Sequence, residues 1–173
     1  MDEPGGNLIV VTGVLSAGKT TISREIGSRS SFRYFDGDGF LKAHPPTPFD
    51  LLPANLPSYT QRIRERMLNE IGNRLESENV VLDMILPAPY VERIRARFGD
   101  RALLALLTVE ATEQQRREAR RGGDTDPQRK WAASRTDLSG PDSLYDLVVD
   151  TTPSSPGNCA EQILSKARDR WRA

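Results

Sequence analysis

A glycine-rich segment near the start of the chain has the residue types that hold a polyphosphate. Residues 13–20 read Gly-Val-Leu-Ser-Ala-Gly-Lys-Thr and directly follow an apolar run from Leu8 to Thr12. This is the G-x-x-x-x-G-K-[ST] pattern of a P-loop, whose backbone N–H groups curl around phosphate at a helix N-terminus. We predict that Lys19 reaches the β- and γ-phosphates and that the Thr20 hydroxyl ligates Mg²⁺. The residues expected to hold the nucleotide here are Gly13, Ser16, Ala17, Gly18, Lys19, Thr20 and Thr21.

Two carboxylates follow a second apolar run. The chain reads Phe-Asp-Gly-Asp-Gly-Phe over residues 35–40. An acceptor alcohol needs a carboxylate within hydrogen-bond reach to orient it and take its proton, and we assign this role to Asp38. Asp36 is assigned to Mg²⁺. The alternative, that these aspartates are turn residues capping the next helix, is common for Asp-Gly pairs and stays open.

A third apolar run ends in an acid, Val80-Val81-Leu82-Asp83. This pattern is typical of a Walker-B element, in which the carboxylate holds Mg²⁺ or its waters. A turn or helix-capping role for Asp83 is the alternative.

An arginine-rich segment over residues 110–121 follows a fourth apolar run. Arg117 and Arg121 are four residues apart and can act together on one helical face. Arginines that fold over the transferring phosphoryl group stabilise its developing charge, so we predict a closing lid hinged at residues 122–127. The alternative is an exposed charged helix face.

The alternation of apolar runs with helical patterns predicts an α/β domain with a parallel sheet covered on both faces. The predicted strands are Leu8 to Thr12, Phe32 to Asp36, Val80 to Met84, Leu103 to Val109 and Leu144 to Asp150. The predicted helices lie near residues 19–29, 59–77, 88–98, 112–121 and 158–171.

The segment of residues 44–53 contains too many prolines for a regular helix and is expected to cover a substrate. We predict an acceptor site within about residues 40–67 and a lid within about residues 112–135. Candidate acceptor contacts are Phe40, His44, Tyr59, Asp83 and Arg135, besides Asp38. For His44 a helix-end hydrogen bond is the alternative, and for Arg135 an ordinary surface position.

Composition limits the classes of function. The 173 residues suit one domain, and 24 basic side chains balance 24 acidic ones, so no global field attracts nucleic acid or an anionic membrane. Cys159 is the only cysteine, which excludes an internal disulfide and suits a reducing cytoplasm. The first residues are acidic, and no apolar run approaches membrane-spanning length. We expect a cytoplasmic protein with a small-molecule partner; its oligomeric state leaves no trace in the sequence.

These motifs, in this order, resemble the chloramphenicol phosphotransferase family. The resemblance rests on Ser16 to Lys19, on the segment from Phe35 to Pro45 and on Tyr145 to Thr152, and it runs from Leu8 to about residue 164. It implies a small P-loop kinase fold with a five-stranded parallel sheet, ATP or GTP with Mg²⁺ as cofactors, and Asp38 as general base. It also implies that the nucleotide base packs between the lid helix and the loop that begins at Thr151.

The segment of residues 80–93, with its Pro-x-x-Tyr-Val-Glu, also looks like tunicamycin-resistance proteins. The proline-rich segment departs from the chloramphenicol enzymes, so we expect an antibiotic that carries a nucleoside or a sugar, phosphorylated on a hydroxyl. Gluconate kinases and zeta-type toxins that phosphorylate nucleotide sugars are similar in the same motifs and stay as alternatives. A nucleotide-binding switch is disfavoured because Asp-x-x-Gly after the third apolar run and Asn-Lys-x-Asp are absent from the sequence.

Overall fold

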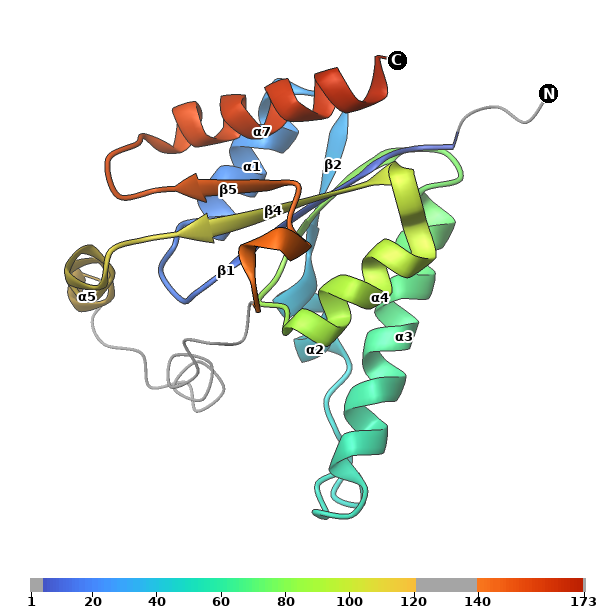
Figure 1. The fold of residues 1–173 in the computed structure, drawn as a ribbon. Helices are drawn as coiled ribbons and strands as arrows, with labels where there is room; N and C mark the ends of the chain where they lie inside the picture. Colours follow the sequence, from blue (N-terminus) through green and yellow to red (C-terminus); the bar gives the residue numbers. More distant parts are fainter. Residues whose placement is uncertain (1–4, 121–139, 173) are drawn as a thin grey trace.

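The computed structural model describes residues 5–120 and 140–172. Its five strands are β1 (Leu8–Gly13), β2 (Phe32–Asp36), β3 (Asn79–Asp83), β4 (Ala102–Thr108) and β5 (Leu147–Asp150). They form one sheet in the order β2-β3-β1-β4-β5, and every pairing is parallel. The predicted five-stranded parallel sheet is confirmed (Figure 1).

Helices cover both faces of this sheet. Helices α1 (Lys19–Arg29) and α7 (Pro156–Trp171) lie on one face, and α3 (Leu56–Arg74) and α4 (Ala88–Phe98) lie on the other (Figure 1). Side chains of the central strand β1 alternate between two cores, with Leu8 and Val10 facing α3 and α4 and Ile9 and Val11 facing α1 and α7. All four are fully buried, as expected for a strand covered on both faces. The remaining helices of the described residues are α2 (Gly37–Ala43), α5 (Ala111–Arg120) and the 3₁₀ turns η1 (Gly99–Arg101) and η2 (Asp142–Leu144).

Helix α2 is an element that the sequence analysis did not predict. It is seven residues long and contains two glycines, which are poor helix formers. Asp36 stabilises it as N-cap, accepting a hydrogen bond from the Gly39 backbone N–H at 2.8 Å. Gly37 is buried, and a Cβ there would lie 2.9 Å from the Asp83 carbonyl oxygen and 2.9 Å from the Met84 Cβ. The close approach that glycine permits places the start of α2 against the end of β3.

Two predicted boundaries also differ. Strand β5 starts at Leu147 rather than at Leu144, because residues 142–144 form η2 and Asp146 bonds to Leu104 through both its backbone N–H and its carboxylate. Helix α3 runs from Leu56 to Arg74 instead of residues 59–77, with a proline in its first turn, where no backbone N–H is needed.

Candidate active site

The loop between β1 and α1 has the conformation of a phosphate cradle. Gly13 has φ 145°, and a Cβ there would lie 2.3 Å from the Leu107 carbonyl oxygen, so only glycine fits. Gly18 has φ 92°, and Ser16 has φ 60°, a left-handed conformation that costs a non-glycine residue about 1 kcal/mol or more. The Ser16 hydroxyl is buried and has no hydrogen-bond partner among residues 5–120 and 140–172. A strained backbone and an unsatisfied buried hydroxyl together indicate a place prepared for a ligand.

The first turn of α1 connects this cradle to β3. Lys19 is 8% exposed and donates a hydrogen bond from Nζ to the Val14 carbonyl oxygen at 2.9 Å. The Thr20 hydroxyl donates to the Asp83 carboxylate at the end of β3. The predicted strand-loop-helix context of the P-loop is therefore present.

Asp83 is a buried carboxylate surrounded by polar groups. It is 5% exposed and accepts a hydrogen bond from the Tyr34 hydroxyl at 3.1 Å. Burial raises the pKa of Asp83 above its ordinary range, although the hydrogen bond from Thr20, the charge of Lys19 and the Tyr34 hydroxyl all act to lower it. The charge of Asp38 acts to raise it. The charge of Asp38 thus reaches the Asp83 carboxylate at this edge of the sheet, where the start of α2 packs against the end of β3.

The strand register places the other acid there too. Asp36 pairs directly with Asp83 across β2 and β3. Its carboxylate accepts a hydrogen bond from the backbone N–H of Gly39. In this structure Asp36 therefore caps the next helix, which was the alternative raised from the sequence. Asp38 lies in the first turn of α2 and is exposed, as a residue that meets an incoming acceptor must be.

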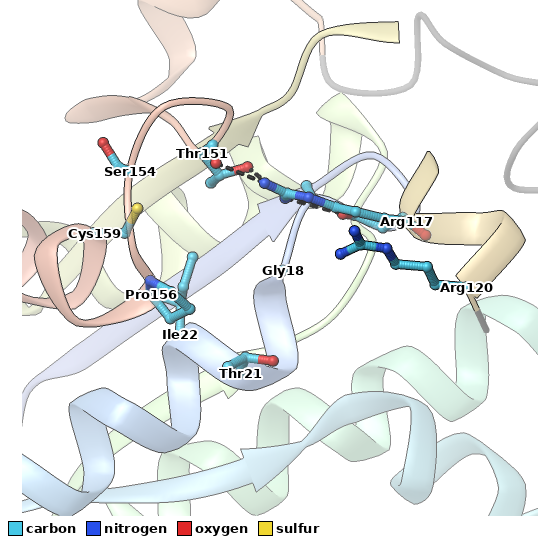
Figure 2. A pocket seen from close by; sticks show the side chains of 11 residues that line it. Gly18, Thr21, Ile22, Arg117, Arg120, Thr151, Ser154, Pro156 and Cys159 are labelled. Atoms are coloured by element: carbon cyan, nitrogen blue, oxygen red, sulfur yellow. Dashed lines mark hydrogen bonds between the residues drawn. The ribbon is translucent and has the colours of Figure 1, made fainter. Parts of the chain in front are cut away.

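A cavity of about 340 Å³ adjoins the P-loop (Figure 2). It lies between the start of α1, the loop that follows β5, and the side chains of α5. Its lining residues are Ser16, Ala17, Gly18, Thr21, Ile22, Arg117, Arg120, Thr151, Ser154, Pro156 and Cys159. The size and position suit a nucleotide whose phosphates extend along the P-loop.

Arg117 joins α5 to two walls of this cavity, the P-loop and the loop after β5. Its Nη2 and Nη1 donate to the Thr151 carbonyl oxygen at 2.7 Å and hydroxyl at 3.1 Å, and Nη1 also donates to the Ser16 carbonyl oxygen at 3.4 Å. Gln114, on the same helix, donates to the Leu15 carbonyl oxygen at 2.9 Å. The guanidinium of Arg117 is thus engaged with both the P-loop and the loop after β5, and its action on the transferring phosphoryl group stays a prediction.

Arg120 is a pocket residue that the sequence analysis did not single out. Figure 2 shows its side chain extending beside that of Arg117 toward the cavity. It is exposed and forms no hydrogen bond or ion pair with the described residues. The i,i+3 spacing from Arg117 was the available signal, because it places both side chains on the same helix face.

The predicted acceptor residues lie around α2. The Phe40 ring lies 4.5 Å from the His44 ring and 5.8 Å from the Phe35 ring, measured between centroids. His44 donates from Nδ1 to the Phe40 carbonyl oxygen at 2.9 Å, the helix-end bond that was the alternative for this residue. Tyr59 donates from its hydroxyl to the His44 carbonyl oxygen at 2.6 Å. These polar groups therefore tie α2 to α3 in this structure.

The family model for chloramphenicol phosphotransferase-like proteins matches residues 6–168, nearly the whole chain. The chain belongs to the chloramphenicol phosphotransferase-like family. This chloramphenicol phosphotransferase-like protein is accordingly a P-loop small-molecule kinase that uses a nucleoside triphosphate as phosphoryl donor. Among curated protein sequences, none matches it.

Solved structures share the fold of this family member at low sequence identity. A gluconokinase from Sinorhizobium meliloti 1021 is 22% identical, with a TM-score of 0.66 over 98% of this chain and 95% of that one. A shikimate kinase from Acinetobacter baumannii is 17% identical, with a TM-score of 0.66 over 98% and 97%. The tunicamycin resistance protein of Deinococcus radiodurans is 14% identical, with a TM-score of 0.62 over 94% and 95%.

Some predicted residues cannot be placed, and the structure adds two residues that the sequence analysis did not name. Arg121, Arg135 and the expected hinge at residues 122–127 lie outside the described residues. Tyr34 was missed, although a strand brings side chains two residues apart to the same face and Tyr34 stands two before Asp36. Thr12 was missed as well, and its hydroxyl accepts from the Leu86 N–H at 3.0 Å, holding the loop after Asp83.

No helix within residues 5–120 and 140–172 is long and apolar enough to cross a bilayer.

Proposed function

We propose that this kinase transfers the γ-phosphate of ATP or GTP to a hydroxyl group of an antibiotic, one that carries a nucleoside or a sugar, and so gives resistance to it. It acts as a single domain in the cytoplasm. One observation carries the proposal: the start of α2, which carries Asp38, packs against the end of β3, where Thr20 of the P-loop bonds to Asp83. The phosphate cradle, a metal-type carboxylate and a candidate general base therefore meet at one edge of the sheet.

The oxygen donors beside the P-loop fit Mg²⁺. The described residues contain no cluster of three or more His, Cys, Asp or Glu side chains. Mg²⁺ does not require one, since in kinases it is held by one or two protein oxygens together with phosphate oxygens and water. Thr20 and Asp83 would hold it, with the exposed carboxylate of Asp36 beside Asp83 as a further oxygen. The ion would neutralise negative charge on the phosphates.

Asp38 supplies the proton chemistry in this proposal. It accepts the proton of the acceptor hydroxyl as that oxygen bonds to the γ-phosphorus, while the bond from this phosphorus to the β-phosphate oxygen breaks and the nucleoside diphosphate leaves. Lys19 stabilises the negative charge that moves along the phosphates.

Two arginines of α5 have different roles in this proposal. Arg117 fixes the helix against Thr151, where the nucleotide base would lie. Arg120 lines the same cavity, has no bonding partner among the described residues, and would reach the phosphates. We propose that Arg120 supports the closing role that the sequence suggested for Arg117 and Arg121.

The acceptor segment favours a largely neutral acceptor over a compact anion. Arg62 is paired with Asp50 at 2.6 Å, and Arg64 lies over the Tyr90 ring at 3.8 Å. With both arginines engaged, Lys42 and Arg66 are the remaining cations within residues 40–67, a small number for binding a carboxylate or phosphate of a metabolite.

The test is a mass-spectrometric screen for one added phosphate. Purified protein, Mg²⁺ and ATP or GTP are incubated with antibiotics, gluconate, shikimate and nucleotide sugars, with the Asp38→Asn protein as the matched control. We expect phosphorylation of an antibiotic by the unchanged protein alone, and greater tolerance of that compound in an expressing host. Phosphorylation of the metabolites with every antibiotic untouched would leave a P-loop kinase and refute the resistance role.

A further inference from the structure

The chain between α2 and the body of α3 forms a projecting arm, which we define as residues 44–62. The buried residues of α3 are Ile63, Met67, Leu68 and Ile71, so its first two turns contribute nothing to the core. Of the arm residues, Asp50 alone is buried. Figure 1 shows this segment extending from the rest of the molecule at the N-terminal end of α3.

A framework of polar bonds makes the arm a defined structure. Asp50 is 9% exposed and accepts hydrogen bonds from the Thr47 N–H at 3.0 Å, from the Thr47 hydroxyl at 2.6 Å and from Arg62 at 2.6 Å. Asn55 donates from its side chain to the Phe49 carbonyl oxygen at 3.0 Å. Tyr59 closes the base of the arm through its bond to His44. The buried Asp50 carboxylate thus lies at the centre of the arm and holds its two ends together through Thr47 and Arg62.

The apolar side chains occupy its outside. Phe49 is 69% exposed, Leu51 56%, Leu52 50% and Leu56 43%. They are four of the five large hydrophobic residues that are exposed in the described part of the chain. Their neighbours Pro48, Pro53, Ala54 and Pro57 are exposed too.

A charged residue is buried here while large apolar residues are exposed, which is the reverse of the usual pattern. An exposed apolar patch of this kind indicates a binding surface. The face is also uncharged. Asp50 is the only charged residue between Ala43 and Arg62, and it is paired with Arg62.

We propose that the apolar face of the arm binds the same face on a second copy of this chain, in a two-fold symmetric dimer. Ordinary side-chain areas and the exposed fractions above give roughly 600 Å² of apolar surface on one arm, so two arms would remove about 1,200 Å² from water. That area reaches the range of specific protein interfaces. A neutral face meets its copy without like-charge repulsion, and a preformed arm loses little conformational freedom on binding.

The experiment measures the mass of the full chain by sedimentation velocity over about a hundred-fold range of protein concentration, where a dimer must dissociate by mass action. We expect a monomer–dimer equilibrium. In the Phe49→Ser/Leu52→Ser protein each substitution occurs twice in the dimer. The dissociation constant of the dimer should therefore rise by about 100-fold or more.

Val148→Ser is the matched control, because Val148 is the remaining large exposed hydrophobic residue, 38% exposed, and lies on β5 outside the arm. It should leave the equilibrium unchanged. Thermal unfolding of all three proteins checks that the folds are intact. A single monomeric mass at every concentration would overturn the proposal, and so would a dimer that the arm substitutions leave intact. A monomer that sediments with phosphatidylcholine vesicles and is released by the arm substitutions would overturn it in favour of a lipid surface.

Discussion

Replacing Gly37 with alanine should both destabilise the protein and slow phosphoryl transfer. The added Cβ would lie 2.9 Å from the Asp83 carbonyl oxygen and 2.9 Å from the Met84 Cβ. Neither atom is the flexible end of a side chain, so the start of α2 would have to move away by roughly half an ångström to restore ordinary contact near 3.5 Å. Overpacking of this kind costs about 1–3 kcal/mol.

Two measurements follow from that displacement. Each kcal/mol should lower the Tm by roughly 2–4 °C in a chain of this size. Asp38 is the next residue, and a misplacement of about 1 Å can cost roughly 10²-fold in rate, so half that distance should lower kcat by about 10-fold. Calorimetry measures the Tm, and a kinetic assay with the acceptor found in the phosphorylation screen measures kcat.

Gly72→Ala is the matched control for this substitution. Gly72 lies within α3, and a Cβ there would meet Arg97 at 3.5 Å and Phe98 at 3.9 Å, which are ordinary contacts. It should gain about 0.5–1 kcal/mol from the better helix propensity of alanine. If the Gly37→Ala protein matched the unchanged protein in Tm and kcat, the close approach of α2 to β3 would not be what positions Asp38.

Three further substitutions test the assigned roles. Lys19→Ala should abolish turnover and weaken nucleotide binding in titration calorimetry while the fold stays intact; a normal kcat would exclude this phosphate site. Asp38→Asn should lower kcat by roughly 10²-fold or more with nucleotide affinity little changed, whereas a collapse of Mg²⁺–nucleotide affinity at a normal saturated rate would make Asp38 a metal ligand. Tyr34→Phe removes a hydrogen bond that favours ionised Asp83, so the pKa of Asp83 should rise further. Because Mg²⁺ needs the ionised carboxylate, the acid limb of Mg²⁺-dependent nucleotide binding should move to higher pH; an unchanged or lower midpoint would contradict this account.

The sequence was sufficient for the sheet and the P-loop, because both depend on local patterns. The buried strands are continuous apolar runs, and the turn at Gly13 to Lys19 is encoded by glycines at fixed spacing. Helix α2 was missed because its stability comes from the Asp36 cap and from the contact of Gly37 with β3, and a contact between distant residues has no local signature.

The partners of the arginines on α5 could not be predicted for the same reason. The sequence gives the spacing of arginines along α5, but the partner of each depends on how the helix docks against the P-loop and β5. Arg117 meets Thr151 and Ser16, while Arg120 points into the cavity. The exposure of Phe49 and its neighbours was also beyond prediction, since the segment of residues 44–53 was expected to cover a substrate.

The way the arm is attached has a consequence for how this protein can diversify. Residues 44–62 join the body at their two ends, and the side chains that α3 contributes to the core begin at Ile63. Changes of length in such a connection cost little, since each doubling of a flexible loop costs only about 0.6 kcal/mol. Mutations, insertions or exchange of the whole segment can therefore accumulate without disturbing β1, α1 or the phosphate cradle. A lineage could acquire a new partner or acceptor by replacing one contiguous stretch of its gene while its nucleotide chemistry is inherited unchanged.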